Sequence, residues 1–351
     1  MFSFTMGGFL SKLKLLQKNK PPALSANSSY SWSNRENTNI DDYLLENVHE
    51  SERWKLPGSI NGQQFIIQNC SNSTIFILDF TNTVTVDDCC HCTLVFGPMK
   101  RSIFIRDCAD CTIVVACEQF RLRDCKNLKV SLYCATRPII ESSKDISFSC
   151  LQLSYTNIKE QFQKCNLNIW NNIWYKIHDY TPANKNDYPN WNFCQEDIQV
   201  TSSIPEIEQL DFSTERNRSV IPLTTGSIYK QTNDAYENCF VLFCDDFSAK
   251  SFLTLINIRT PNIELIKSRQ VNLTVQHAES LFLTSTLIKA IQHGPVIGLH
   301  LCGKSVLHIS SQIISKNMET TLYYVSPTVN MASHQVNTFF GIADLQMESH
   351  S

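Results

Sequence analysis

Several features of specialised proteins are missing from this sequence of 351 residues. It contains no apolar run of about 18 residues or more, so no transmembrane helix is predicted. No signal peptide of the usual form opens it. Only 10 residues are glycine, which excludes a collagen-like chain, and no GxxxxGKS/T or GxGxxG loop is present to bind a phosphate. An ordinary globular chain, long enough for two domains, is predicted.

An excess of charge of one sign is also missing. Lysine and arginine number 30, aspartate and glutamate 33, and the formal net charge is -3. This balance argues against a nucleic-acid partner bound by bulk positive charge. Cysteine, in contrast, is plentiful, with 15 residues. Without a signal peptide, these cysteines are expected to be reduced and cytosolic, and to act as small buried apolar side chains.

A cysteine frame recurs in the first half of the chain. Cys89-Cys90-His91-Cys92 precedes Cys108-Ala109-Asp110-Cys111, and taken alone this is the spacing of a four-thiolate zinc site. An earlier copy at Cys70 and a later copy at Cys125 lack the second cysteine. A metal site does not explain copies without its ligands, whereas a stacked structural repeat does. No metal site is therefore predicted, and a zinc-binding protein is kept as an alternative.

Short apolar alternations recur about every nine or ten residues from Gln64 to Cys150. Runs of three to five β-branched and aromatic residues, bounded by Asn, Asp, Cys and Ser, predict short strands with turns. Two or more strands per coil, repeated at a fixed period, predict a parallel β-helix with the frame cysteines stacked inside one corner. A β-sandwich is the competing interpretation, but its strands would not keep one period with one corner residue.

The pattern changes from about Glu237 onward. Strands are expected at 239–244, 263–271 and 295–301, and helices at 248–258, 277–292 and 304–316. This alternation predicts an α/β layer domain.

The first 20 residues predict a membrane anchor. They carry four lysines and no acid, with apolar residues between them. Met6-Gly7-Gly8-Phe9-Leu10-Ser11 fits the myristoylation pattern, which predicts acylation of Gly7 if Gly7 becomes the N-terminus. One acyl chain holds weakly, and the lysines would add an electrostatic signal. A plain basic tail is the alternative. Residues 21–58 are polar and predict a linker.

Seven further segments carry a resemblance to a known family. They are Leu56-Pro57-Gly58, Gly62-Gln63-Gln64-Phe65, Val84-Thr85-Val86-Asp87-Asp88-Cys89, Gln119-Phe120-Arg121-Leu122-Arg123-Asp124-Cys125, Pro138-Ile139-Ile140-Glu141-Ser142-Ser143, Ile177-His178-Asp179-Tyr180-Thr181-Pro182 and Ala343-Asp344-Leu345-Gln346-Met347. With them the chain resembles the tubulin-binding cofactor C (TBCC/C-CAP) domain family. The resemblance implies a right-handed parallel β-helix at 59–182, a connecting segment at 183–232, and an α/β ferredoxin-like domain at 233–351 resembling nucleoside diphosphate kinase.

The resemblance also implies a function. It indicates a GTPase-activating protein for an Arf-like small GTPase, notably Arf-like 3, linked to trafficking of lipidated ciliary and membrane proteins. GTP and Mg²⁺ would belong to the partner, so no cofactor of its own is expected. The implied locations are the cytoplasm, the cytoplasmic face of the plasma membrane and the ciliary base. Tubulin-related or trafficking factors are further expected partners. The alternative is a non-catalytic effector or tubulin-cofactor-like scaffold that binds the GTP-loaded GTPase.

Arg121 is the central candidate residue. Period-two alternation places Phe120 and Leu122 inward and Arg121 outward. From alternation alone, Arg121 is an ordinary surface arginine. The resemblance implies an arginine finger that enters the GTPase site in trans and neutralises charge on the transferring phosphoryl group. Gln119 lies on the same outward face, and the resemblance implies that it supports either the finger or the switch region of the partner.

Four more residues are expected near this site. Glu141 follows Arg121 by about one coil, and the resemblance implies that it pairs with and aims the arginine. Arg123 either contacts the GTPase or pairs with Asp124. Tyr180 matches a partner-contact position, with packing of the linker as the alternative. Glu118 stands where the family has a second glutamine, which brings a negative charge near the phosphate.

Kinase activity is not expected from the α/β domain. Gly294-Pro295-Val296 resembles a strand start in nucleoside diphosphate kinases, and His293 precedes it. The catalytic histidine of those enzymes lies in an N-x-x-H-G-S setting, which this chain lacks. His293 is instead expected at the end of a helix, near its C-terminal dipole.

Overall fold

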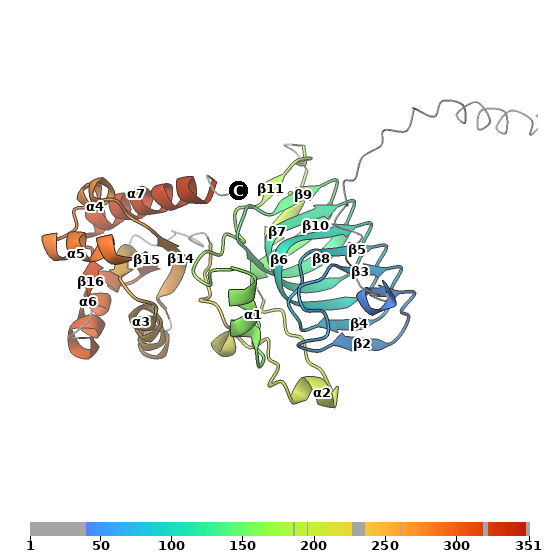
Figure 1. Cartoon of the computed structure of the whole chain (residues 1–351). Helices are drawn as coiled ribbons and strands as arrows, with labels where there is room; N and C mark the ends of the chain where they lie inside the picture. Colours follow the sequence, from blue (N-terminus) through green and yellow to red (C-terminus); the bar gives the residue numbers. More distant parts are fainter. Residues whose placement is uncertain are drawn as a thin grey trace, which may run out of the picture. The chain divides into compact units, whose positions relative to one another are not determined.

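The computed structural model describes residues 40–184, 187–194, 196–226, 236–260, 262–318 and 322–348 (Figure 1). Gly7 and the lysines of the predicted anchor lie outside these residues. Residues 40–351 form one compact unit. No described helix is long and apolar enough to cross a membrane.

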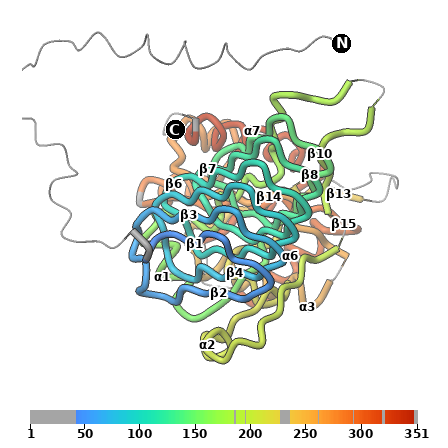
Figure 2. The backbone as a smooth tube through the Cα atoms, turned by 90° about the vertical axis from the view of Figure 1, so that its right-hand side faces the viewer, coloured from blue at the N-terminus to red at the C-terminus, as the bar shows by residue number. Residues whose placement is uncertain are grey.

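A parallel β-helix occupies the first half of the described chain, as predicted. Its strands all pair in parallel and belong to one 12-stranded sheet. Successive coils follow one another as parallel turns of the tube in Figure 2. The elements are the 3₁₀ helix η1 (Ile40–Tyr43) and the strands β1 (Leu44–Glu46), β2 (Glu52–Lys55), β3 (Phe65–Gln68), β4 (Thr74–Ile77), β5 (Val84–Asp87), β6 (Thr93–Arg106), β7 (Thr112–Arg123), β8 (Lys126–Cys134), β9 (Ile139–Glu141), β10 (Lys144–Cys150), β11 (His178–Asp179) and β12 (Trp191–Phe193).

The cysteine frame marks one inner corner of this β-helix. Cys70, Cys89, Cys108 and Cys125 are at most 3% exposed, and each thiol donates a hydrogen bond to the carbonyl two residues before it at 3.1–3.3 Å. The preceding Asn or Asp has a left-handed backbone in every copy, with φ between 52° and 54°. Asn and Asp tolerate this conformation better than other side chains. The predicted internal stack is therefore confirmed.

The second position of the frame is also buried. It is occupied in turn by Ser73, Cys92, Cys111 and Leu128, each less than 5% exposed. Serine and leucine suit this position because it requires a buried side chain and not a metal ligand. Among the described residues, no group of three possible metal ligands includes a frame thiol.

The β-helix begins earlier in the sequence than expected. Strands β1 and β2 lie within the segment predicted as a linker, and they pair with β3 and β4 as a first coil. Their side chains are mostly half-buried or exposed. A terminal coil covers the stack on one side only, so it lacks the apolar alternation by which the inner coils are recognised.

Three short helical segments follow β10. They are α1 (Ile158–Lys164), α2 (Pro205–Glu208) and the 3₁₀ helix η2 (Arg216–Arg218). Helix α1 packs on the β-helix through Phe162, whose ring meets Tyr133 edge to face at 5.4 Å between centroids.

The C-terminal part is an α/β domain, as predicted. Its four strands are antiparallel, in the order β14-β15-β13-β16, and the β-α-β-β-α-β succession is ferredoxin-like. Buried side chains of β13 alternate between two cores, one under α3 and α6 and the other under α4, α5 and α7. The elements are β13 (Glu237–Phe243), α3 (Asp246–Arg259), β14 (Glu264–Val271), α4 (Val275–Ser280), α5 (Ser285–Ala290), η3 (Ile291–His293), β15 (Val296–Gly303), α6 (Val306–Asn317), β16 (Tyr323–Val325) and α7 (Val329–Glu348).

One predicted element of this domain is wrong in its extent. The helix expected at 277–292 is divided into α4, α5 and η3. Phe282 between α4 and α5 has a left-handed backbone, with φ of 56°, and the Thr284 side chain caps the second helix by accepting from the amide of Leu287. A residue in the left-handed region ends the helix. Strand β16 and helix α7 were not anticipated.

The segment before β11 is hydrogen-bonded to the edge strand β14. Asn171 and Gln270 exchange two hydrogen bonds, at 2.8 and 3.2 Å. The fully buried Arg269 donates to the Asn172 carbonyl at 3.0 Å and to the Tyr175 hydroxyl at 3.1 Å. These contacts position the α/β domain against the segment between α1 and β11.

Candidate functional site

Strand β7 presents the candidate finger as the alternation predicts. Phe120 and Leu122 are at most 1% exposed, and Arg121 between them is exposed. Phe120 packs edge to face on Phe148, at 5.9 Å between ring centroids. The backbone of Arg121 is therefore fixed by a buried strand while its side chain points outward.

Arg121 belongs to an outward column in which both of its in-register neighbours are apolar. Parallel register aligns Phe104 of β6, Arg121 of β7, Ile139 of β9 and His178 of β11, which we call the Arg121 column. The guanidinium carbon lies 6.0 Å from the centre of the Phe104 ring, a cation–π distance. Among the described residues, none forms an ion pair with Arg121. Its donors are thus directed to solvent.

Gln119 lies two residues before Arg121 on the same outward side of β7. It is half-buried, in register with Ser102 of β6, and accepts a hydrogen bond from the Ser102 hydroxyl at 3.2 Å. The structure therefore brings Gln119 and Arg121 to one face, as the sequence predicts. The supporting role of Gln119 stays a prediction.

Glu118 forms an ion pair that the sequence does not predict. Its carboxylate lies 3.5 Å from a guanidinium nitrogen of Arg101, on the neighbouring coil. The register between β6 and β7 shifts just before this point, which brings the two side chains together. The Glu118 carbonyl accepts from the amide and hydroxyl of Thr136. The negative charge expected near the phosphate is therefore balanced within the chain.

A second outward column lies beside the first. Asp87, Arg106, Arg123 and Glu141 are in register across β5, β6, β7 and β9, and we call them the Arg123 column. The Arg123 guanidinium pairs with Asp124 at 3.2 Å. The pairing of Arg123 with Asp124 is therefore observed, while its contact with a GTPase stays a prediction.

Glu141 does not lie directly opposite Arg121, as expected, but two residues further along β9. The coil that starts at Arg121 closes at Ile139, so Glu141 lies opposite Arg123. It shares the outward face with Arg121 but is a diagonal neighbour. Residues in this relation are about 7–8 Å apart at Cα, which long side chains can span. Its aiming role stays a prediction.

Tyr180 continues the outward face at the next coil. Its amide donates to the Ile140 carbonyl at 2.9 Å, and its ring lies edge to face against His178, at 4.5 Å between centroids. The side chain is 61% exposed. It is therefore available to a partner, while its role as a partner contact stays a prediction.

A cavity of about 330 Å³ opens beside Arg121. The β-helix lines it through Gln119, Arg121 and Ile139 among others, and helix α7 closes it with Asp344 and Met347. No residue of this helix is predicted from the sequence to belong to the site. Because α7 is far away in the sequence, only the fold shows this proximity.

Positive charge gathers at the cavity and behind it. Lys176 lines the cavity and forms an ion pair with Asp344. Burial, followed by the charges of Lys176 and Arg269, lowers the pKa of Lys267. With Arg121 also on the wall, this surface suits an anionic partner.

Two thiols of the frame, those of Cys89 and Cys108, are poor candidates for metal ligands. The side-chain interaction with the next thiol of the stack, together with burial, raises the pKa of Cys89 and of Cys108 to about 12. These thiols stay protonated at neutral pH, whereas a metal binds the thiolate. His293 lies at the end of η3, near the helix end expected for it.

Comparison with known proteins identifies the family. A model described as tubulin binding cofactor C matches residues 62–180, which span β3 to β11. Protein XRP2 of Danio rerio is 40% identical over 341 residues, which cover 93% of this chain and 89% of that protein. Protein XRP2 of Homo sapiens is 39% identical over 353 residues, covering 97% and 99%. The chain belongs to the XRP2 family.

The resemblance to the tubulin-binding cofactor C domain family, predicted from the sequence motifs, is thereby confirmed. All the candidate residues from Glu118 to Tyr180 lie within the matched cofactor C segment. A solved structure, tubulin binding cofactor C from Leishmania major, covers 46% of this chain and 90% of its own, at 20% identity and a TM-score of 0.30. At that score the likeness carries no argument.

Proposed function

We propose that this XRP2-family protein activates an Arf-like small GTPase, of the Arf-like 3 type, by supplying Arg121 in trans. The proposal is supported by the exposure and the contacts of this guanidinium. It is exposed, set over Phe104, and without an ion pair among the described residues. A guanidinium with uncommitted donors, on a rigid strand, is suited to enter the nucleotide site of a partner.

The chemistry follows from the charge of the transition state. Water attacks the γ-phosphorus of GTP, the bond to the β-phosphate oxygen breaks, and negative charge builds on that oxygen and on the transferring group. A planar, permanently charged guanidinium donates to these oxygens, and such a finger is worth about 10³–10⁵ in rate. GTP and Mg²⁺ are held by the partner, whose own glutamine orients the water. Gln119 supports the arginine, and Glu141 aims it.

Single-turnover GTP hydrolysis by a panel of Arf-like GTPases tests this function. The wild-type chain should accelerate hydrolysis by at least one member of the panel. Arg121→Ala should abolish the acceleration and leave binding to the GTP-loaded partner measurable. Arg106→Ala is the matched control, because Arg106 is an outward arginine of the next column that already has an acidic partner. Unchanged stimulation by Arg121→Ala would refute the finger.

A non-catalytic scaffold is the second candidate function. Two observations favour it: the matching family model is described as tubulin binding cofactor C, and Glu118 places a carboxylate next to Gln119. A scaffold would bind the GTP form, or a tubulin-related protein, without changing the hydrolysis rate. Tight binding across the panel with no acceleration would decide for it.

Membrane attachment through Gly7 is a further part of the proposal. The Gly7 motif and the lysines after it support acylation combined with electrostatic adhesion. This would place the protein at the plasma membrane and the ciliary base, in the traffic of lipidated proteins. Labelling of cells with a myristate analogue should mark the wild type and Gly8→Ala but not Gly7→Ala. A wild-type chain that stays unlabelled and retains Met1 would contradict this part.

A further inference from the structure

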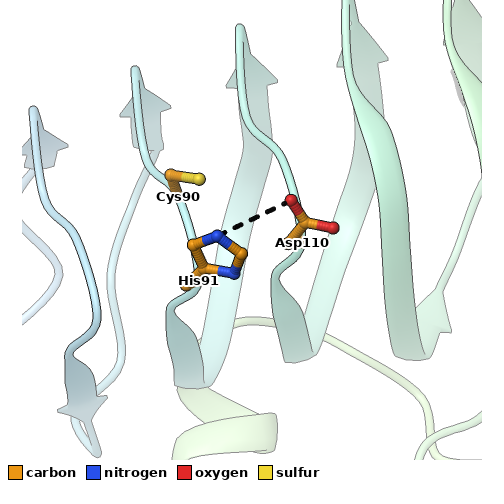
Figure 3. A group of neighbouring side chains, drawn as sticks. All are labelled: Cys90, His91 and Asp110. Carbon is orange, nitrogen blue, oxygen red and sulfur yellow. Dashed lines mark ion pairs between the residues drawn. The ribbon is translucent and has the colours of Figure 1, made fainter.

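Two neighbouring turns of the β-helix bring a thiol, an imidazole and a carboxylate together at its surface. Cys90 and His91 lie in the turn before β6, and Asp110 lies in the turn before β7. One donor atom from each side chain lies within 4.8 Å of the other two. Figure 3 shows the imidazole turned toward the Asp110 carboxylate, with the Cys90 sulfur on the same side. None of the three lines the cavity beside Arg121.

The backbone holds these two turns at a fixed spacing. Cys90 and Ala109 form a parallel bridge, the His91 amide donates to the Ala109 carbonyl at 3.1 Å, and the Asp110 amide donates to the Lys126 carbonyl at 3.0 Å. His91 and Asp110 share a left-handed backbone, with φ of 53° and 54°. Their side chains therefore leave equivalent positions on successive coils. The donors are preorganised by the same stacking that builds the β-helix.

The surroundings leave room for a bound ion. Ala109 lies in register with Cys90 and fills only the volume of a methyl group. Asn127 donates to one oxygen of Asp110 at 2.6 Å, and the other oxygen lies 3.9 Å from Nε2 of His91. A hydrogen bond from a neighbouring amide is the kind of outer partner that orients a ligating carboxylate.

We propose that Cys90, His91 and Asp110 form a site for a divalent transition metal of the Zn²⁺ class. The ligands are Sγ of Cys90, Nε2 of His91 and an oxygen of Asp110. A thiolate excludes the hard cations Mg²⁺ and Ca²⁺, which take oxygen ligands, and a mixed sulfur, nitrogen and oxygen set suits Zn²⁺. Zinc bonds of about 2.0–2.3 Å to these atoms need only small side-chain movements from the observed separations. Three protein ligands leave a fourth position open to water or another molecule.

This site differs from the zinc site suggested by the cysteine spacing. That spacing uses Cys89, Cys92, Cys108 and Cys111, which are all buried and point into the β-helix. The surface site uses Cys90, the cysteine between the two frame positions, which is only half-buried. Because the site needs one residue from each of two coils, no contiguous sequence motif marks it.

Titration of the full chain with Co²⁺, kept reduced by a phosphine that does not compete for metal, tests the proposal. We expect one equivalent to bind with a thiolate-to-cobalt charge-transfer band, and one equivalent of Zn²⁺ to remove that band. Cys90→Ser should abolish the band. His91→Ala and Asp110→Asn should weaken Co²⁺ binding by more than about tenfold, and Asn127→Ala by about tenfold.

Cys194→Ser is the matched control. Cys194 is the other half-buried thiol of the described β-helix region and belongs to no group of metal ligands. This variant should bind Co²⁺ as the wild type does. Cys90, His91 and Asp110 lie in turns, and Asn127 lies near the start of β8 with an exposed side chain, so circular dichroism should show an unchanged fold. A wild type that binds no stoichiometric Co²⁺, or a Cys90→Ser variant that retains the band, would overturn the site.

Discussion

Two adjacent columns on the same face of the β-helix use arginine in opposite ways. In the Arg123 column, Arg106 donates two hydrogen bonds to Asp87, at 2.7 and 2.8 Å, and Arg123 pairs with Asp124 at 3.2 Å. Each guanidinium is occupied by an acid of its own chain. The Arg106 pair connects neighbouring coils of the stack, and the Arg123 pair connects adjacent residues.

The Arg121 column differs in the residues around its arginine. Phe104 and Ile139 are the in-register neighbours of Arg121. Neither of these two side chains can accept a hydrogen bond from the guanidinium. An arginine between apolar neighbours keeps its donors for a molecule that arrives. Exposure therefore does not distinguish Arg121 from the arginines of the Arg123 column, whereas the identity of the in-register neighbours does.

Replacing the guanidinium by an ammonium should have the largest effect. Arg121→Lys keeps the charge but loses the planar set of donors, so stimulated single-turnover hydrolysis should fall by about 10²-fold or more. The same change in the Arg123 column, Arg106→Lys, should leave the rate within about twofold, because the guanidinium of Arg106 is paired with Asp87. Equal losses in the two variants would remove the distinction between the columns.

An acidic side chain placed in register with Arg121 should form an ion pair with it and occupy its hydrogen-bond donors. Ile139→Asp places a carboxylate in register with Arg121, as Asp87 is with Arg106. We expect stimulated hydrolysis to fall by about tenfold relative to Ile139→Asn, which has the same shape without the charge. Identical rates for the Asp and Asn variants would show that occupation of the guanidinium is irrelevant.

The pair of Arg101 and Glu118 should have a smaller effect. Arg101→Ala leaves the Glu118 carboxylate unbalanced near the incoming phosphates, so the rate should fall by about threefold. Glu118→Gln in the same chain should restore it, and a double-mutant cycle measures the coupling. Additive effects of the two changes would contradict the proposed charge balance.

The exposed ion pair of the Arg123 column should have the smallest effect. Asp87→Asn removes the acceptor of Arg106, and both side chains are partly exposed to water. The free energy of unfolding, measured in urea, should fall by about 0.5–1 kcal/mol with no change in stimulated hydrolysis. A large change in the hydrolysis rate would mean that this column also contributes to the site.

The sequence predicted the part of the architecture that has a local signal. The period of the apolar alternation and the cysteine frame were sufficient for the β-helix, its inner corner and the outward direction of Arg121 and Gln119. The strands and helices of the α/β domain up to α6 also agree closely, apart from the helix that Phe282 interrupts.

Register could not be predicted because the coils differ in length. The step from Phe104 to Arg121 is 17 residues and that from Arg121 to Ile139 is 18, so a fixed period misplaces Glu141. Because register could not be predicted, the sequence also did not indicate that Cys90 and His91 lie close to Asp110. The wall of the cavity formed by α7 depends on tertiary packing, for which the sequence has no local signal.

Capture of the transition state tests the central claim most directly. Aluminium fluoride and GDP in the partner imitate the transferring phosphoryl group, whose charge an arginine finger neutralises. The wild-type chain should form a stable complex with the partner loaded in this way, as measured by gel filtration. Arg121→Ala should fail to form it, while still binding the partner loaded with a non-hydrolysable GTP analogue. Capture of the aluminium fluoride form by Arg121→Ala as tightly as by the wild type would contradict the account.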